Sequence, residues 1–213
     1  AISIQEVATE ITGSSGNCYT TIPFTNQAPF INNVPNYTIP KSTPFVLTAI
    51  GTDADNDPLT YCWEQMNSTG SATQPPVSTN TSGPMFRSLD DIISPSRYFP
   101  PLANIINGTN NTWEVLPSVA RTLNFRVTVR DYHTIAGCTD EDDVTVTVNG
   151  TAGPFNITSF NTSDIWTEGQ TKTVTWNVAG TTGNGINCAN VDILLSTDGG
   201  FTYPITLATA TAN

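Results

Sequence analysis

Two stretches of this chain alternate apolar and polar side chains with a period of two. They read LNFRVTV over 123–129 and VTVTV over 144–148, and they predict strands at 122–130 and 142–149. Successive side chains of a strand point to opposite faces of the sheet, so each strand should have one buried and one solvated face. Such strands are typical of antiparallel sheets. Shorter runs of the same kind predict further strands at 30–34, 36–39, 44–51, 58–66 and 112–116.

An acidic turn followed by a tryptophan marks one end of the first predicted sandwich. The stretch 51–65 reads GTDADNDPLTYCWEQ: it follows an apolar strand, turns through Pro58 and enters a strand in which we expect Trp63 to fill the core. With the alternating strands, it predicts an immunoglobulin-like β-sandwich over 28–149. The Pro-, Ser-, Thr- and Asn-rich segment 67–111 is too long for a simple connection and is predicted to be a structured insertion. Two segments are expected to anchor it, at 86–89 and 97–100.

A second β-unit is predicted after a Gly- and Pro-containing boundary at 149–154. Trp176 lies on an alternating run, and Asp198-Gly199 is typical of a tight hairpin turn. About four strands fit in this part, whereas an immunoglobulin-like sandwich has about seven. We therefore expect 150–213 to be a second, incomplete sandwich. Its predicted strands are 155–160, 172–178, 191–196 and 202–208.

The fold class expected from these patterns is all-β, with two tandem antiparallel sandwiches of the cadherin, PKD or fibronectin type III kind. The exception is a predicted amphipathic helix at 2–12, which Gly13 would end. An isolated helix of this length is only marginally stable in water. Residues 1–27 are therefore expected to be the helical end of an upstream domain and a linker.

Composition and charge narrow the function classes. The formal net charge is −11 with only seven Lys and Arg, so we expect no nucleic-acid partner, because such a partner requires a cationic face. No apolar run approaches the roughly 18 residues of a membrane span. Charged residues make up only 12% of the chain, while Thr, Asn and Ser are abundant. This composition predicts a secreted or cell-surface β-protein.

The acidic loops are the candidate metal site. Asp53, Asp55 and Asp57 alternate around one turn, and a second acidic loop is expected at the same end of the sandwich. Carboxylate oxygens suit Ca²⁺, although the spacing is not that of an EF-hand. The alternative is that these carboxylates are solvated turn residues. The residues predicted to bind a structural Ca²⁺ are Asp53, Asp55, Asp57, Asp131, Asp140 and Asp142.

No catalytic motif is recognisable. His133 is the sole histidine, whereas a zinc helix of the HExxH type needs two and a hydrolytic triad needs a nucleophile beside the base. This chain is therefore expected not to be catalytic itself. A sugar-binding face remains an alternative, for which the aromatic candidates are Tyr98, Phe99, Trp113, Tyr132 and Tyr203.

The four cysteines are too far apart in sequence for a zinc knuckle and allow two disulfides. Cys62 starts a strand and Cys138 lies in the last inter-strand loop at the same end of the sandwich. The preferred bridge is therefore Cys62–Cys138. Cys18 and Cys188 would then pair with each other or with segments outside this chain. The alternative is that some cysteines are buried thiols.

Several motifs resemble the region downstream of the catalytic domain in secreted bacterial reprolysin-like zinc metallopeptidases. In the first predicted sandwich these motifs are NQAPFI, DADNDPLTYCWEQM, FRVTVRD and DEDDVTVTV. In the second part they are GPFNITSFN, TVTWNVAGT and NCANVDILLSTDGGFTY. The start of the chain, AISIQEVATEI followed by GNC, is similar to the closing helix and cysteine of the catalytic domain itself.

The resemblance implies a non-catalytic accessory segment of a secreted or cell-surface metallopeptidase. Its partner would be an upstream protease domain in the same polypeptide, and zinc would be bound only there. Because the zinc helix is missing here, no catalytic residue is carried over to this chain. The segment would act as a spacer or docking module, or bind a protein or glycan ligand. The alternatives are a surface adhesin or carbohydrate-binding module unrelated to proteolysis and, more distantly, a glycan-active enzyme.

Overall fold

The computed structural model describes residues 13, 25–70, 72–134, 136–160 and 164–213. The predicted helix at 2–12 and Cys18 lie outside these residues. The described part is mostly β, with one short helix, α2 (Leu102–Asn107). Among the described residues, no helix has both the length and the apolar character needed to cross a membrane. The prediction of an all-β protein is confirmed for this part of the chain.

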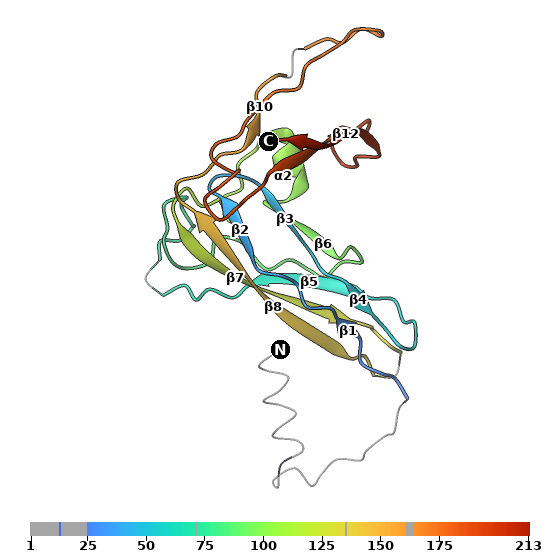
Figure 1. The fold of residues 1–213 in the computed structure, drawn as a ribbon. Helices are drawn as coiled ribbons and strands as arrows, with labels where there is room; N and C mark the ends of the chain where they lie inside the picture. The colour runs from blue at the N-terminus through green and yellow to red at the C-terminus, as the bar shows by residue number, and fades with distance from the viewer. Residues whose placement is uncertain (1–12, 14–24, 71, 135, 161–163) are drawn as a thin grey trace.

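The largest sheet has four strands in the order β2-β8-β7-β5 (Figure 1). Its central strands are β7 (Arg121–Arg130) and β8 (Thr139–Asn149), which pair antiparallel along their length, and β5 (Thr60–Gln65) pairs antiparallel with β7. The edge strand β2 (Tyr37–Pro40) pairs with β8 in parallel. The expectation of purely antiparallel sheets is therefore wrong for β2. This early strand pairs with β8 rather than with β3, which follows it in sequence.

In the first part of the chain, two strand pairs lie outside this sheet. They are β3 (Phe45–Thr48) with β6 (Ser96–Phe99) and β1 (Phe30–Ile31) with β4 (Gly51–Thr52), both antiparallel. Aromatic rings join the β3–β6 pair to the large sheet. The ring of Phe99 lies 4.7 Å from that of Phe125 on β7 and stacks on Phe45 at 4.9 Å. Trp63, predicted to fill the core, is 3% exposed, which confirms that prediction.

The insertion at 67–111 is part of this core. Both predicted anchors contribute a buried phenylalanine, Phe86 and Phe99, and the segment also supplies β6 and α2. The predicted strand at 112–116 is wrong: this segment has only an isolated bridge between Asn111 and Glu114. Glu114 is instead buried against Arg97, 2.7 Å from its guanidinium.

The C-terminal part forms two separate antiparallel pairs. These are β9 (Asn156–Ile157) with β10 (Trp176–Asn177), and β11 (Asn190–Leu195) with β12 (Ile205–Ala212). After Ala152, Thr181 is the only described residue that is buried. Trp176, which lies on the alternating run predicted here, is only half-buried. β11 and β12 pair as a hairpin, but the tight turn predicted at Asp198-Gly199 is wrong, because the longer segment 196–204 connects the two strands. Within this segment Thr202 donates to Asp198 through both its backbone N–H and its hydroxyl.

Candidate metal centre

The loop between β4 and β5 gathers three carboxylates. One oxygen from each of Asp53, Asp55 and Asp57 lies within 4.8 Å of the others. The loop folds around Asp53, whose Oδ1 accepts the backbone N–H of Asp55 at 2.8 Å and of Asp57 at 3.1 Å. Asn56 between them has a φ of 63°, a left-handed conformation that asparagine tolerates better than most residues. The local sequence DADND therefore turns its alternate carboxylates towards one point.

Two of the converging carboxylates have an oxygen that is shielded from solvent and has no partner in the described part of the chain. Oδ2 of Asp53 and Oδ2 of Asp57 are shielded from solvent and have no hydrogen-bond partner among the described residues. An uncompensated buried carboxylate oxygen is unfavourable by several kcal/mol, so such atoms are normally paired or bound to a cation. Carboxylate oxygens without a proton donor are the ligands that Ca²⁺ prefers. The loop is thus chemically suited to a hard divalent cation.

A further acidic residue, Asp131, directly follows β7 and is 1% exposed. Its Oδ1 accepts the backbone N–H of Cys138 at 2.7 Å and that of His133 at 3.3 Å, and its Oδ2 accepts the side-chain amide of Asn26 at 2.8 Å. Burial alone would raise the pKa of Asp131, but these hydrogen bonds outweigh it and lower that pKa below the ordinary value. Asp131 therefore holds the loop after β7 in shape.

The segment before β1 links the two acidic loops. Asn26 donates to Asp131, and the next residue, Gln27, donates its backbone N–H to Oδ2 of Asp55 at 2.7 Å. Oδ1 of Asn26 is also shielded from solvent and, like Oδ2 of Asp53 and of Asp57, has no hydrogen-bond partner within the described part of the chain. Sequence reasoning missed Asn26. Its only signal was a polar residue just before the first predicted strand.

The other predicted calcium ligands have different partners. Oδ2 of Asp140 accepts the backbone N–H of Ile31 at 2.9 Å, and Oδ2 of Asp142 accepts that of Val34 at 2.7 Å. Both aspartates lie near the start of β8 and hold the end of β1 and the segment after it against this strand. Within the described residues, Asp53, Asp55 and Asp57 are the group that converges as a metal cluster, and the predicted ligands Asp131, Asp140 and Asp142 do not join it.

The preferred disulfide is not formed, because Cys62 and Cys138 are both free thiols. The prediction relied on both cysteines lying at the same end of the sandwich, but β7 lies between β5 and β8. Cys62 faces Thr128 of β7, and Cys138 precedes Thr139, the first residue of β8. Strands two places apart are about 10 Å apart, whereas the Cα atoms of a disulfide lie within about 7 Å.

The remaining candidates fall at separate places. Cys188 is a free thiol close to Asn190. Of the aromatic candidates for a sugar-binding face, Phe99 is fully buried and so cannot contribute, while Trp113 and Tyr132 are exposed. Tyr132 donates its hydroxyl to Asp91, which raises the pKa of Tyr132 above its ordinary value.

Comparisons with known proteins add no family. No family model matches this chain, and neither the curated proteins nor the solved structures gave a match. The function must therefore be argued from the site and the motifs alone.

Proposed function

We propose that this chain is a calcium-stabilised, non-catalytic β-sandwich module. The observation that carries this proposal is the pair of shielded oxygens on Asp53 and Asp57 that have no partner among the residues the structure describes. Both lie in one loop whose third carboxylate, Asp55, points to the same place. A cation there would neutralise three like charges brought within 4.8 Å of one another.

Calcium in this loop would act on more than the loop itself. Asp55 is already bonded to the backbone of Gln27, and Asn26 to Asp131. Fixing the Asp53–Asp57 loop would therefore also fix the strand entry at 26–34 and the loop after β7. The expected role is mechanical: one end of the module becomes rigid when calcium binds, as suits a spacer between domains exposed to extracellular calcium.

The wider role that we propose is an accessory segment of a secreted bacterial metallopeptidase, acting as a spacer or docking module for an upstream protease domain. This part of the proposal depends on the resemblance carried by DADNDPLTYCWEQM and NCANVDILLSTDGGFTY. It is tested by sequencing the reading frame upstream of this chain. A zinc-binding HExxHxxGxxH motif shortly before residue 1 supports it, and an upstream frame without a protease contradicts it while leaving the calcium proposal intact.

Calorimetric titration with Ca²⁺ tests the site. Wild-type protein should bind with a Kd on the order of 10⁻⁴ M, typical of extracellular modules. The double variant Asp53→Asn/Asp57→Asn should show no binding heat. The matched control is Asp90→Asn, which removes an exposed carboxylate outside the cluster and should bind like wild type. Absence of heat with wild type, or unchanged heat with the double variant, refutes the proposed site.

A further inference from the structure

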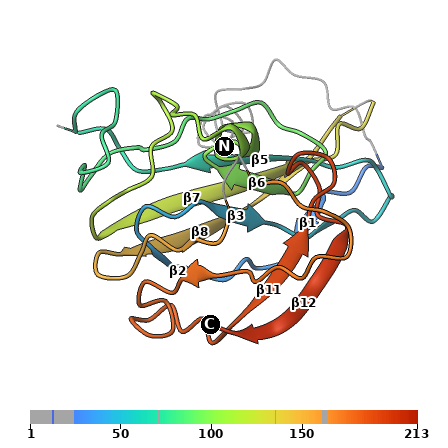
Figure 2. The ribbon, with the colours of Figure 1, turned by 90° about the horizontal axis from the view of Figure 1, so that it is seen from above.

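The long insertion at 67–111 and the residues that follow it form two open hollows. Their volumes are about 360 and 450 Å³, within the range of small-ligand sites. Both have walls from the same two segments, 74–78 and 109–116. Figure 2 shows the teal loops around residue 75 at the side of the molecule away from β11 and β12. The hollows therefore do not depend on the C-terminal part of the chain.

The two hollows lie next to each other. On one segment, Pro76 lines the first hollow and Val77 lines the second. On the other segment, Trp113 lines the first hollow and Glu114 lines the second. Because neighbouring residues on both walls continue from one hollow to the next, the two hollows form one groove, which we call the insertion groove.

Hydrogen bonds fix the walls of the insertion groove. The backbone N–H of Val115 donates to the carbonyl oxygen of Met85 at 3.0 Å, and Met85 is fully buried. The backbone N–H of Ser118 donates to the carbonyl oxygen of Ser78 at 2.8 Å, and the Ser118 hydroxyl donates to the same oxygen at 3.1 Å. The groove is therefore formed before a ligand binds, as small-ligand sites usually are.

The first hollow exposes an indole ring. Trp113 is 44% exposed, although tryptophan is on average a highly buried residue. Its backbone N–H donates to Oδ1 of Asn111 at 3.0 Å, which holds the turn that presents the ring. The face of an aromatic ring is apolar and carries partial negative charge, so the C–H groups of a sugar ring pack favourably on it.

The second hollow is lined by a buried carboxylate. The Glu114 side chain is 1% exposed, and its Oε1 lies 2.7 Å from Nη2 of Arg97. Its Oε2 is shielded from solvent and has no hydrogen-bond partner among the residues that the structure describes. A buried acceptor of this kind requires a donor. Because Arg97 already balances the charge of Glu114, a neutral donor such as a hydroxyl group suits this place better than a cation.

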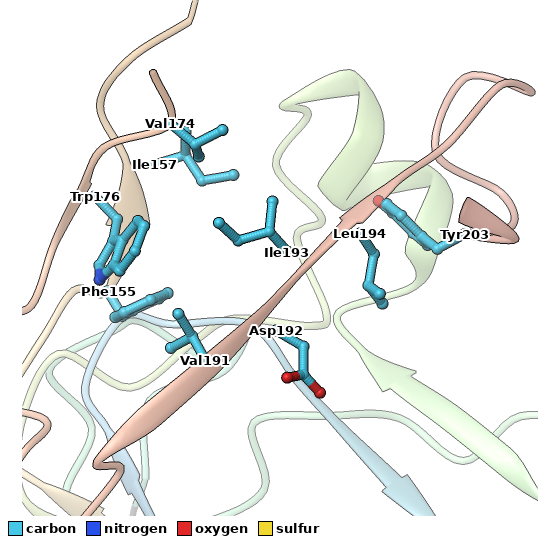
Figure 3. A pocket seen from close by; sticks show the side chains of 9 residues that line it. All are labelled: Phe155, Ile157, Val174, Trp176, Val191, Asp192, Ile193, Leu194 and Tyr203. Carbon is cyan, nitrogen blue, oxygen red and sulfur yellow. The ribbon is translucent and has the colours of Figure 1, made fainter. Parts of the chain in front are cut away.

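The groove beside the C-terminal hairpin is different, because its lining is almost wholly apolar. It has a volume of about 270 Å³ and lies between the β9–β10 pair and β11 (Figure 3). The carboxylate of Asp192, which also lines it, already accepts the backbone N–H of Ala210 at 2.8 Å. Sites that select a ligand combine apolar walls with a few polar groups that are able to bind it. The insertion groove has both.

We propose that the insertion groove binds a neutral oligosaccharide, with a sugar ring on the indole of Trp113 and a hydroxyl group donating to Oε2 of Glu114. The exposed side-chain amides of Gln74 and Asn110 line the groove and can donate to and accept from further hydroxyl groups. The net charge of −11 disfavours an acidic saccharide. A neutral chain of sugars therefore matches the exposed ring, the amides and the shielded acceptor together.

NMR of the tryptophan indole N–H groups tests this proposal. The chain has four tryptophans and therefore four indole signals, and the signal missing from Trp113→Ala belongs to Trp113. The probes are cellotetraose, xylotetraose, mannotetraose and N-acetylated chitotetraose, each at about 10 mM, which detects Kd values up to the millimolar range. At least one probe should shift the Trp113 signal. Unchanged positions of the remaining indole signals in Trp113→Ala show that the variant is folded.

Calorimetric titration with the probe that shifts this signal measures the contacts. Trp113→Ala should weaken binding at least tenfold, as expected for an aromatic residue at the centre of a site, and Asn110→Ala about fivefold, the loss of one hydrogen bond. The matched control is Trp166→Ala, which removes a ring of similar exposure, 48%, outside the groove and should bind like wild type.

Three results would overturn the proposal. In the first, none of the four probes shifts the Trp113 signal. In the second, a probe binds but its affinity is unchanged in Trp113→Ala. In the third, a proline-rich peptide shifts the Trp113 signal and no oligosaccharide does, which would assign the groove to a protein partner.

Discussion

The buried Arg97–Glu114 pair ties the long insertion to the core, and removing its negative charge should destabilise the protein strongly. Nη2 of Arg97 lies 2.7 Å from Oε1 of Glu114, and their side chains are 9% and 1% exposed. Arg97 also donates to the backbone carbonyls of Trp63 and Arg87 and packs over the ring of Phe99. The change that tests this arrangement is Glu114→Gln, which keeps the shape and an acceptor oxygen but leaves the guanidinium charge uncompensated.

The size of the effect follows from burial. Removing one partner of a buried ion pair destabilises proteins by about 3–5 kcal/mol, because the other charge stays desolvated. Glutamine can still accept a hydrogen bond from Arg97, so we expect a loss near the lower end, about 3 kcal/mol.

Urea unfolding at pH 7, followed by tryptophan fluorescence, measures this loss. The matched control is Glu141→Gln, which breaks a pair of the same length, 2.7 Å to Nη1 of Arg126, at a partly exposed site. Arg126 keeps its contact with Asp143, and an exposed pair contributes about 0–1 kcal/mol. If Glu114→Gln and Glu141→Gln unfold at the same urea concentration with the same slope, the insertion is not held by this pair and the reasoning is refuted.

Three further changes test other parts of the structure. The hydrogen bonds that lower the pKa of Asp131 contribute stability that is present above about pH 4 and is lost as the pH falls through the folded-state pKa. In EDTA, the variant Asp131→Asn should therefore have a lower melting temperature than wild type at pH 7. Its melting temperature should also fall less than that of wild type on acidification. Burial raises the pKa of the Cys62 thiol, so iodoacetamide should modify Cys62 more slowly than the partly exposed Cys188 in native protein, and mass spectrometry without reductant should find Cys62 unbridged. Phe99→Ala removes a fully buried ring and should destabilise the protein by about 3–5 kcal/mol in urea unfolding; a loss below 1 kcal/mol would mean that β6 does not belong to the core.

The strands of the large sheet could be predicted because local alternation determines them. The predicted strands at 58–66, 122–130 and 142–149 correspond to β5, β7 and β8. A side-chain period of two is visible in any strand with one buried face, whatever its partner.

The parts that sequence reasoning missed depend on distant contacts. β6 contains an arginine that is buried only because Glu114, 17 residues later, neutralises it. The parallel pairing of β2 with β8 joins residues more than a hundred positions apart. The same reason explains the wrong disulfide, since the sequence spacing of Cys62 and Cys138 does not determine the order of the strands in the sheet.

Only the part of the candidate site that depends on local sequence could be predicted. Asp53, Asp55 and Asp57 are near neighbours in sequence, so their turn could be read locally. The roles of Asn26 and Asp131 rest on a hydrogen bond across 105 residues. Asp140 and Asp142 look identical to metal ligands in sequence, and only the fold shows that the amides of Ile31 and Val34 occupy their Oδ2 atoms.

The measurement that tests the calcium site most directly is the melting temperature of the full chain in EDTA and in excess Ca²⁺. At a calcium concentration about 100 times the Kd, binding to the folded state adds about 2.7 kcal/mol, which for a chain of this size raises the melting temperature by about 5–10 °C. The rise should vanish in Asp53→Asn/Asp57→Asn and persist in Asp90→Asn. Identical melting of wild type in EDTA and in Ca²⁺ would contradict the account, and the acids of this loop would then be solvated turn residues.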